Sequence, residues 1–324
     1  MSLKAAYSNS SPFAQLLILI ASVIAGSMIF SFIGVFIVTA QEINNLPQMG
    51  DTDAMAAFIK DLTANPAYMK QIQLLSQIGM FILPTFLCAW MFSPNYKKYL
   101  KIEYLPKPSM LGLTMLAIIF LFPFVNLTLY LNQQMVLPEW LSGLESWMRQ
   151  SEDSNNGLIE RMLAADNLGM LLINLLVMAI LPGFGEEILF RGVGQNIMGR
   201  IFKNHHAVIW IVAVIFSAIH NQYYGFIPRM LLGATFGYLL FYTRNMWIPI
   251  IAHFTHNAFS VITYYIFQNS PEKAEQIDSI GMASTWWLGI ASLALFLIIF
   301  FQIKKQSEDL VDSDSCRPKL DSES

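Results

Sequence analysis

The sequence predicts an all-α protein that crosses a membrane several times and encloses a polar site in its helix bundle. Of the 324 residues, 55% are hydrophobic and only 13% are charged, whereas a soluble globular domain carries about 25% charged residues. Long apolar runs recur along the chain, and about 20 apolar residues suffice for one membrane-spanning helix. One stretch places ionisable residues inside such runs. These three observations favour a polytopic membrane protein with a buried site.

About eight transmembrane helices are expected. The fourth run begins at Leu168 and continues past Pro182, and polar residues blur the ends of the fourth and fifth runs. The other seven runs are Phe13–Ala40, Leu74–Phe92, Met110–Leu131, Ala207–His220, Phe226–Tyr242, Trp247–Phe267 and Trp286–Ile303.

The first run, Phe13–Ala40, follows Lys4 and resembles a secretory signal. The apolar part of such a signal usually has about 7–15 residues, and this run is much longer. We therefore expect a transmembrane helix here. The loop of residues 132–167 is acidic and contains Trp140 and Trp147, which suggests a helix lying at the membrane interface.

Orientation follows from the distribution of Lys and Arg, which concentrate in cytoplasmic loops. With the N-terminus in the cytoplasm, 13 of the 19 Lys and Arg residues fall on the cytoplasmic side and 6 on the other side. This count places Arg191 in a cytoplasmic loop. We expect both termini in the cytoplasm, in the plasma membrane of a bacterium.

Three units are expected along the chain. Residues 1–166 hold the first three spans and two outward loops, residues 167–268 form a core with the polar motifs, and residues 269–324 add the last span and a polar cytoplasmic tail. The net charge of −3 and the lack of a basic run give no sign of a nucleic-acid partner. The expected partners are the lipid bilayer and a membrane-associated protein or peptide substrate.

The first motif lies in the segment Leu181–Gly192, LPGFGEEILFRG. Glu187 and Arg191 are four residues apart, so on a helix they share a face and can form an ion pair. Glu186 points about 100° away and is therefore the candidate for a reactive carboxylate facing a cavity. Pro182 and the glycines after it are expected to break or bend the span. The alternative is an interfacial charge cluster at a helix end.

Two further motifs follow. His220 ends the fifth run, where a single histidine is commonly a capping or interfacial residue. His253 and Asn257 are four residues apart in the seventh run, so one helix face offers an imidazole and an amide. His256 competes with His253, and the spacing to Asn257 favours His253. A buried ionisable residue at membrane depth is a functional candidate by default. Tyr223, Tyr224 and Arg229 are expected to be interface anchors.

These residues carry a resemblance to a known family. The segment Glu186–Arg191 resembles the EExxxR motif of the CAAX prenyl endopeptidase type II family, also called CPBP for CAAX proteases and bacteriocin-processing proteins. Phe216–His220 is similar to its FxxxH motif, and His253–Asn257 to its HxxxN-type motif. The resemblance covers roughly residues 168–266. It implies a multi-spanning intramembrane protease with its active site buried in the helix bundle. By resemblance, the catalytic set is Glu186, His220, His253 and Asn257, with Glu187 and Arg191 in the first motif.

The chemistry of these side chains fits peptide hydrolysis, which needs a base for water, a donor for the oxyanion and an acid for the leaving amine. Glu186 is the natural base, and His220 can hold the same water or shuttle its proton. His253 and Asn257 can donate to the oxyanion. The alternative is a zinc site with Glu186, His220 and His253 as ligands. The expected cofactor is therefore none or zinc, and the poor ligand Asn257 favours the metal-free version.

Other classes stay open at this point. No HExxH motif is present, which disfavours a zincin. A small-solute transporter is an alternative, although transporters commonly have paired halves with broken helices. A non-catalytic immunity or scaffold membrane protein is another. For an endopeptidase, the substrate is a prenylated CAAX-like protein, another membrane-associated protein or a peptide precursor.

Overall fold

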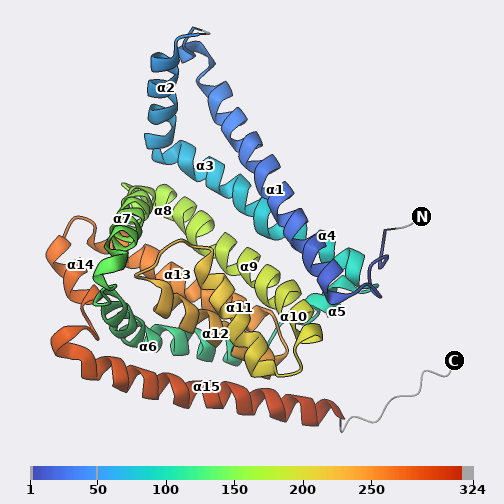
Figure 1. Ribbon diagram of the computed structural model, residues 1–324. Helices are drawn as coiled ribbons and strands as arrows, with labels where there is room; N and C mark the ends of the chain where they lie inside the picture. The colour runs from blue at the N-terminus through green and yellow to red at the C-terminus, as the bar shows by residue number, and fades with distance from the viewer. Residues whose placement is uncertain (1–2, 49, 316–324) are drawn as a thin grey trace.

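The computed structural model describes residues 3–48 and 50–315, and Figure 1 shows their arrangement. All regular secondary structure in these two ranges is helical, which confirms the predicted all-α class. The α-helices are α1 Pro12–Gln41, α2 Thr52–Ala64, α3 Pro66–Gln77, α4 Leu83–Phe92, α5 Tyr96–Leu100, α6 Pro108–Gln133, α7 Ser142–Leu163, α8 Leu168–Leu175, α9 Leu181–Glu187, α10 Gln195–Ile201, α11 His205–Ala218, α12 Phe226–Thr243, α13 Trp247–Phe267, α14 Pro271–Asp278 and α15 Trp286–Ser315.

Short turns of other helix types join or interrupt them. The 3-10 turns are η1 Ile43–Asn45, η3 Glu139–Leu141 and η6 Ala283–Thr285, and the π-helical turns are η2 Ile78–Ile82, η4 Leu176–Ile180 and η5 Ile188–Gly194.

Five helical stretches among the described residues are long and apolar enough to cross a membrane. They contain the first four and the last of the expected spans, so the membrane-protein class is confirmed. Helix α11 is apolar but shorter, and α12 and α13 are not among the five. Both helices contain polar residues that lower their mean hydropathy, among them Arg229 in α12 and His253, His256 and Asn257 in α13. The count of eight spans is therefore not confirmed. The five stretches are Pro12–Gln41, Pro66–Phe92, Pro108–Gln133, Leu168–Ile201 and Ala283–Glu308.

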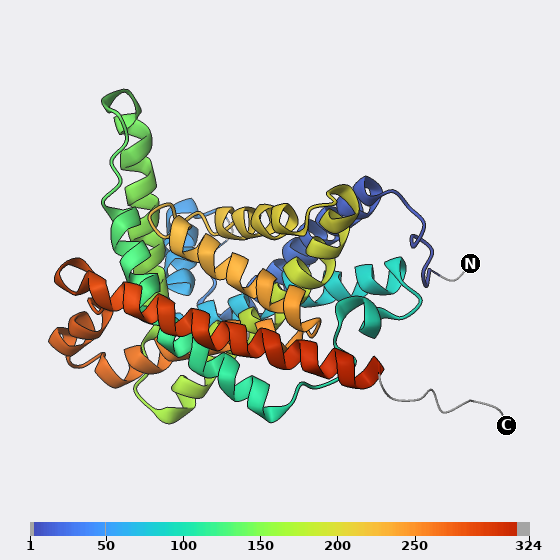
Figure 2. The same cartoon turned by 90° about the horizontal axis from the view of Figure 1, so that it is seen from below.

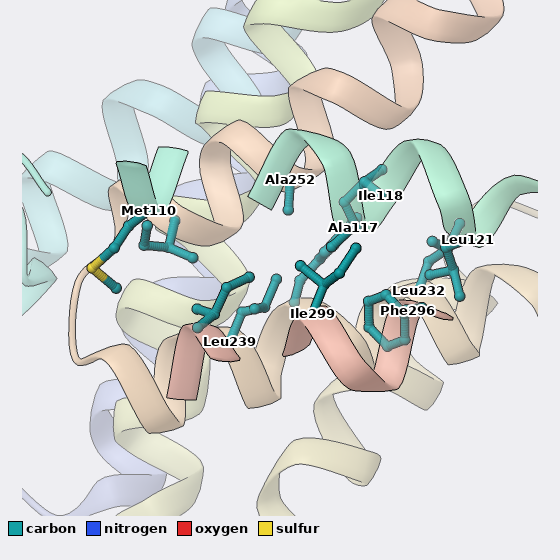
Figure 3. Packing of buried hydrophobic residues seen from close by; sticks show 12 residues of the cluster. Met110, Ala117, Ile118, Leu121, Leu232, Leu239, Ala252, Phe296 and Ile299 are labelled. Atoms are coloured by element: carbon teal, nitrogen blue, oxygen red, sulfur yellow. The ribbon is translucent and has the colours of Figure 1, made fainter. Parts of the chain in front are cut away.

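A hydrophobic core holds α6, α12, α13 and α15 together. Figure 3 shows side chains from these helices meeting, with Ile118 and Leu121 of α6 facing Phe296 and Ile299 of α15. Phe236 of α12 is buried in the same cluster, with only 1% of its surface exposed. This core fixes α12 in place. It also fixes α13, the helix that carries the His253–Asn257 motif.

Helix α1 packs against α3, η2 and α4, and Figure 1 shows this group standing beside the rest of the bundle. Two glycines allow the helices to cross at backbone contact. A Cβ atom on Gly26 would lie 2.0 Å from the carbonyl oxygen of Gly79, so neither position has room for a side chain.

The fourth membrane stretch is a continuous helix of 34 residues, Leu168–Ile201, so the expected break near Pro182 is wrong. Pro182 cannot donate a hydrogen bond, but inside a membrane helix a donor from a neighbouring helix can replace the missing one. The π-helical turns η4 and η5 stand before and after α9 instead. The carbonyl of Val177 in η4 accepts a hydrogen bond from Gln77 Nε2 at 3.0 Å. Such wide turns are rare in proteins overall, and those that occur are often found at functional sites.

The acidic loop expected at the interface contains α7, as predicted. Figure 2 shows α7 running across the end of the bundle rather than along it. At the C-terminal end, α15 continues beyond the expected limit at Ile303 to Ser315, so the first part of the polar tail is helical. Residues 316–324 of that tail lie outside the described residues.

Candidate active site

Glu187 and Arg191 form the expected ion pair. Arg191 Nη1 lies 3.0 Å from Glu187 Oε1, and both side chains are completely shielded from solvent. Arg191 Nη2 also donates to the carbonyl oxygen of Gly233 at 2.8 Å, and the guanidinium lies 4.5 Å from the ring centre of Phe216. Arg191 is therefore an interior residue. Its assignment to a cytoplasmic loop is wrong, because its charge is neutralised within the bundle.

Glu187 also binds His253 on α13. His253 Nδ1 and Glu187 Oε1 are 2.8 Å apart, although the two residues are 66 positions apart in the chain. The imidazole stacks on the ring of Phe236, with ring centres 5.0 Å apart. The ring orientation of His253 is thus fixed from two sides. With Nδ1 turned toward Glu187, the atom left to face other groups is Nε2.

Glu186 points in another direction from Glu187, as the helical spacing predicts. Its Oε2 atom lies 4.0 Å from His253 Nε2, which is beyond a direct hydrogen bond. The residue is 8% exposed and lines a cavity of about 550 Å³. Glu187 and Arg191 do not line this cavity. The two glutamates therefore have different surroundings, one at the cavity and one in an ion pair beneath it.

His220 lies in the turn after α11, not at the end of the helix as expected. Its Nδ1 donates to the carbonyl oxygen of Phe216 at 2.7 Å, and its ring packs against the edge of the Phe216 ring. A carbonyl oxygen only accepts, so this bond assigns the proton to Nδ1. In the neutral ring, Nε2 then has a free lone pair.

The cavity brings together four of the six candidate residues. Glu186 comes from α9, His220 from the turn after α11, and His253 and Asn257 from α13. His256 also lines the cavity and stacks on Phe122, with ring centres 4.8 Å apart. Both His253 and His256 therefore line the cavity. His253 differs from His256 in its hydrogen bond to Glu187.

Sequence reasoning missed several polar groups of the cavity, Arg229 and Gln77 among them. Arg229, expected to be an interface anchor, lines the cavity and donates through Nη2 to Gln222 Oε1. Its Nη1 is buried and has no hydrogen-bond partner among the described residues. Gln77 of α3 lines the cavity as well. An arginine inside an apolar run was the available signal for Arg229.

Gly183 explains how α13 comes close to α9. A Cβ atom on Gly183 would lie 2.9 Å from the backbone nitrogen of Phe254, the residue next to His253. The glycine at this position therefore lets the backbone of α13 approach α9 closely.

The donor types of Glu186, His220 and His253 suit zinc, but their arrangement does not make a metal site. Among the described residues, no group of three or more His, Cys, Asp or Glu side chains is placed to hold a metal ion. His253 Nδ1 bonds Glu187, so only its Nε2 could be a ligand atom, and Nε2 stands 4.0 Å from Glu186. We derive no chemical step through a metal.

The fold and this cavity define an all-helical membrane protein with carboxylate and imidazole groups enclosed between its helices. The family profile described as "Type II CAAX prenyl endopeptidase Rce1-like" matches residues 168–259. The resemblance carried by the three motifs is thereby confirmed for this segment, and this family is one of membrane endopeptidases.

Two proteins of Bacillus subtilis (strain 168) are similar to part of the chain. "Uncharacterized protein YpbD" is 30% identical over 89 residues, which are 26% of this chain and 42% of that protein. "Putative membrane peptidase YdiL" is 33% identical over 90 residues, which are 27% of this chain and 36% of that protein. The matched region thus spans less than half of either relative. No solved structure matches the chain.

Proposed function

We propose that the protein is an intramembrane endopeptidase that hydrolyses a peptide bond in a membrane-associated protein or peptide. One observation carries the proposal: Glu186, His220, His253 and Asn257, supplied by three separate segments of the chain, line one cavity. A base, two imidazoles and an amide around one space are the groups that peptide hydrolysis requires.

Glu186 acts as the general base in this proposal. Its carboxylate and His253 Nε2 are 4.0 Å apart, a separation at which a water molecule can stand between two polar groups. A water held there donates one proton to Glu186, and its oxygen attacks the peptide carbonyl. Glu186 then carries the proton to the leaving amine, so one carboxyl group serves both halves of the reaction.

His253 acts as an oxyanion donor in its doubly protonated form. With Nδ1 donating to Glu187, only an imidazolium offers an N–H at Nε2. Arg191 offsets the charge of Glu187 within their buried ion pair, and a protonated His253 stands 4.0 Å from the carboxylate of Glu186.

Asn257 and His220 complete the site. The amide of Asn257 offers a second N–H to the oxyanion, four residues after His253 on the same helix. His220 Nε2 accepts a hydrogen bond from the attacking water, because Nδ1 is occupied by the Phe216 carbonyl. The guanidinium of Arg229 adds positive charge at the cavity, where charge develops in the transition state.

The substrate class follows from the family and from the cavity. A prenylated CAAX-like protein is one candidate, and a peptide precursor or another membrane-associated protein is the other. Many residues of the cavity wall are apolar, among them Val125, Leu129 and Leu232. An extended segment with apolar side chains fits this wall.

The test is a comparison of protein termini in membranes from cells with the wild-type protein and with Glu186→Gln. New N-termini present only with the wild type identify substrates and cleavage sites. Glu139→Gln is the matched control, because Glu139 is an exposed glutamate outside the cavity. Identical termini in all three samples would contradict the proposed protease.

A further inference from the structure

Hydrogen bonds between loops define two ends of the helix bundle. At the first, which we call the basic end, Arg200 in the last turn of α10 donates to Gln15 in the first turn of α1 and to the carbonyl of Ser10 just before it, at 2.7 and 2.8 Å. At this same end, the backbone amide of Met246 donates to the carbonyl of Lys101 at 3.0 Å. The segments 3–11, 93–107, 202–204 and 244–246 therefore lie together.

The opposite end, which we call the site end, is tied by a second set of bonds. Asn132 at the end of α6 accepts from the amide of Ile227 at 2.8 Å, and Glu152 of α7 accepts from the amide of Tyr224 at 2.8 Å. Gln268 after α13 donates to the carbonyl of Ala165 at 2.6 Å. Helix α12 connects the two ends with 18 residues, or about 27 Å at 1.5 Å per residue. This length is close to the hydrocarbon thickness of a bilayer.

The cavity with Glu186 belongs to the site end. Its wall includes Leu158 and Met162 of α7 and the loop residues His220, Gln222 and Gly225, all from segments at that end. A separate cavity of about 1060 Å³ lies at the basic end, lined by Lys101, Arg200, Arg244 and Lys304. Glu186, His220, His253 and Asn257 do not line it. Arg191 lines the cavity at the basic end, whereas Glu186, His220, His253 and Asn257 line only the cavity at the site end.

Charge separates the two ends. The basic end and the helix termini beside it carry most of the cations, and at the site end Arg149 is paired with Glu145 at 2.7 Å. When Arg191 is no longer counted on the cytoplasmic side, that side still has more Lys and Arg residues than the other side. The cations of the basic end are Lys4, Lys97, Lys98, Lys101, Lys107, Arg200, Lys203, Arg244, Lys304 and Lys305. The acids of the site end are Glu139, Glu145, Glu152, Asp153, Glu160, Asp166, Glu272, Glu275 and Asp278.

Cation-rich ends of membrane helices face the cytoplasm, so the site end faces away from it. We propose that the catalytic cavity is reached from the outer side of the membrane, and that the substrate is a polypeptide segment exposed at the outer leaflet. This inference rests on the proposed protease function. The substrate class is an exported precursor or the outward part of a membrane protein. A segment that stays in the cytoplasm cannot reach Glu186.

The orientation is tested by cysteine labelling in intact cells. The background chain carries Cys88→Ala and Cys316→Ser, and one cysteine is added by Ser154→Cys on α7 or by Lys203→Cys at the basic end. Both positions are exposed and lie outside the cavity. A membrane-impermeant maleimide should label Ser154→Cys in intact cells, and Lys203→Cys only after the membrane is opened. Any other distribution overturns the proposal, because the two positions must lie on opposite sides.

The substrate class is tested by the position of each cleavage that depends on Glu186. Termini are mapped in wild-type and Glu186→Gln membranes and are compared with the topology of each cleaved protein. Cleavages in outward or exported segments are expected. Cleavages in cytoplasmic segments overturn the inference while the protease stands. If no cleavage depends on Glu186, the proposed function fails, and the labelling result still decides the side from which the cavity is reached.

Discussion

Glu187 Oε1 accepts from two partners at once, Arg191 Nη1 at 3.0 Å on its own helix and His253 Nδ1 at 2.8 Å on α13. The second glutamate of the first motif therefore holds the histidine of the third motif in position. This contact links two helices and leaves Glu186 as the carboxylate that faces the cavity. The adjacent glutamates should consequently respond differently to substitution.

Glu186→Gln should abolish cleavage with little loss of thermal stability. The amide keeps the size of the side chain but cannot take a proton from water, and Glu186 makes no direct hydrogen bond to His253 at 4.0 Å. Cleavage of a substrate identified by its termini, together with the unfolding temperature in detergent, measures both effects.

Glu187→Ala should instead destabilise the protein, by about 3–5 kcal/mol, since it leaves the buried Arg191 without its carboxylate. The measurement is the unfolding temperature in the same detergent, with wild type and Glu186→Gln beside it. Equal unfolding temperatures for the two glutamate variants would show that the assignment of faces is wrong.

Asn257→Ala should lower the rate of cleavage about 10²–10³-fold, as the loss of one oxyanion donor does elsewhere. Because the oxyanion exists only in the transition state, kcat should fall while KM stays near the wild-type value. The control is Ser260→Ala, three residues further along the same cavity wall. A loss confined to KM would assign Asn257 to substrate binding.

Activity should survive prolonged chelation, and the purified protein should carry far less than one equivalent of zinc. The physical reason is that no proposed step uses a metal, and that no group of three or more His, Cys, Asp or Glu side chains among the described residues is placed to hold one. Elemental analysis and chelator-treated assays measure this. A metal mechanism predicts stoichiometric zinc that disappears with His220→Ala, and activity that returns when zinc is added back.

Gly183→Ala should destabilise the protein by about 1–3 kcal/mol through overpacking, because the new Cβ would meet the backbone nitrogen of Phe254 at 2.9 Å. The matched control is Gly199→Ala in α10, where no atom lies within 4 Å of the added Cβ. That change should stabilise the helix by about 0.5–1 kcal/mol. Unfolding temperatures of the pair measure the difference, and equal effects would contradict the close approach of α13.

Much of the site could be predicted because it depends on local helical spacing. The four-residue spacing predicts the ion pair of Glu187 with Arg191, and the rotation of about 100° per residue predicts that Glu186 has other neighbours. The contact of Glu187 with His253 could not be predicted in this way. It depends on how closely α9 and α13 pack, and this distance is set by side-chain volumes across the whole interface.

The predictions that failed also depend on contacts between helices, which local spacing does not reveal. Arg229 was expected to be an interface anchor, and only the packing of α12 against α13 places it at the cavity. The break expected at Pro182 did not form, because Gln77 Nε2 of α3 donates to the carbonyl of Val177, five residues before the proline, in place of the missing amide. The wide turns on either side of α9 leave no clear mark in the apolar pattern, so sequence alone did not locate them.

The wide turn Leu176–Ile180 has a consequence for the length of the motif helix. A turn bonded from i to i+5 contains one residue more than an ordinary α-helical turn. Loss of one residue inside it would convert it to an ordinary turn and leave the faces of α8 and α9 where they are. Loss of one residue inside α9 would rotate everything beyond that point by about 100°. The helix can therefore lose one residue within Leu176–Ile180 without turning Glu186 away from the cavity, whereas a loss within α9 before Glu186 would turn it away.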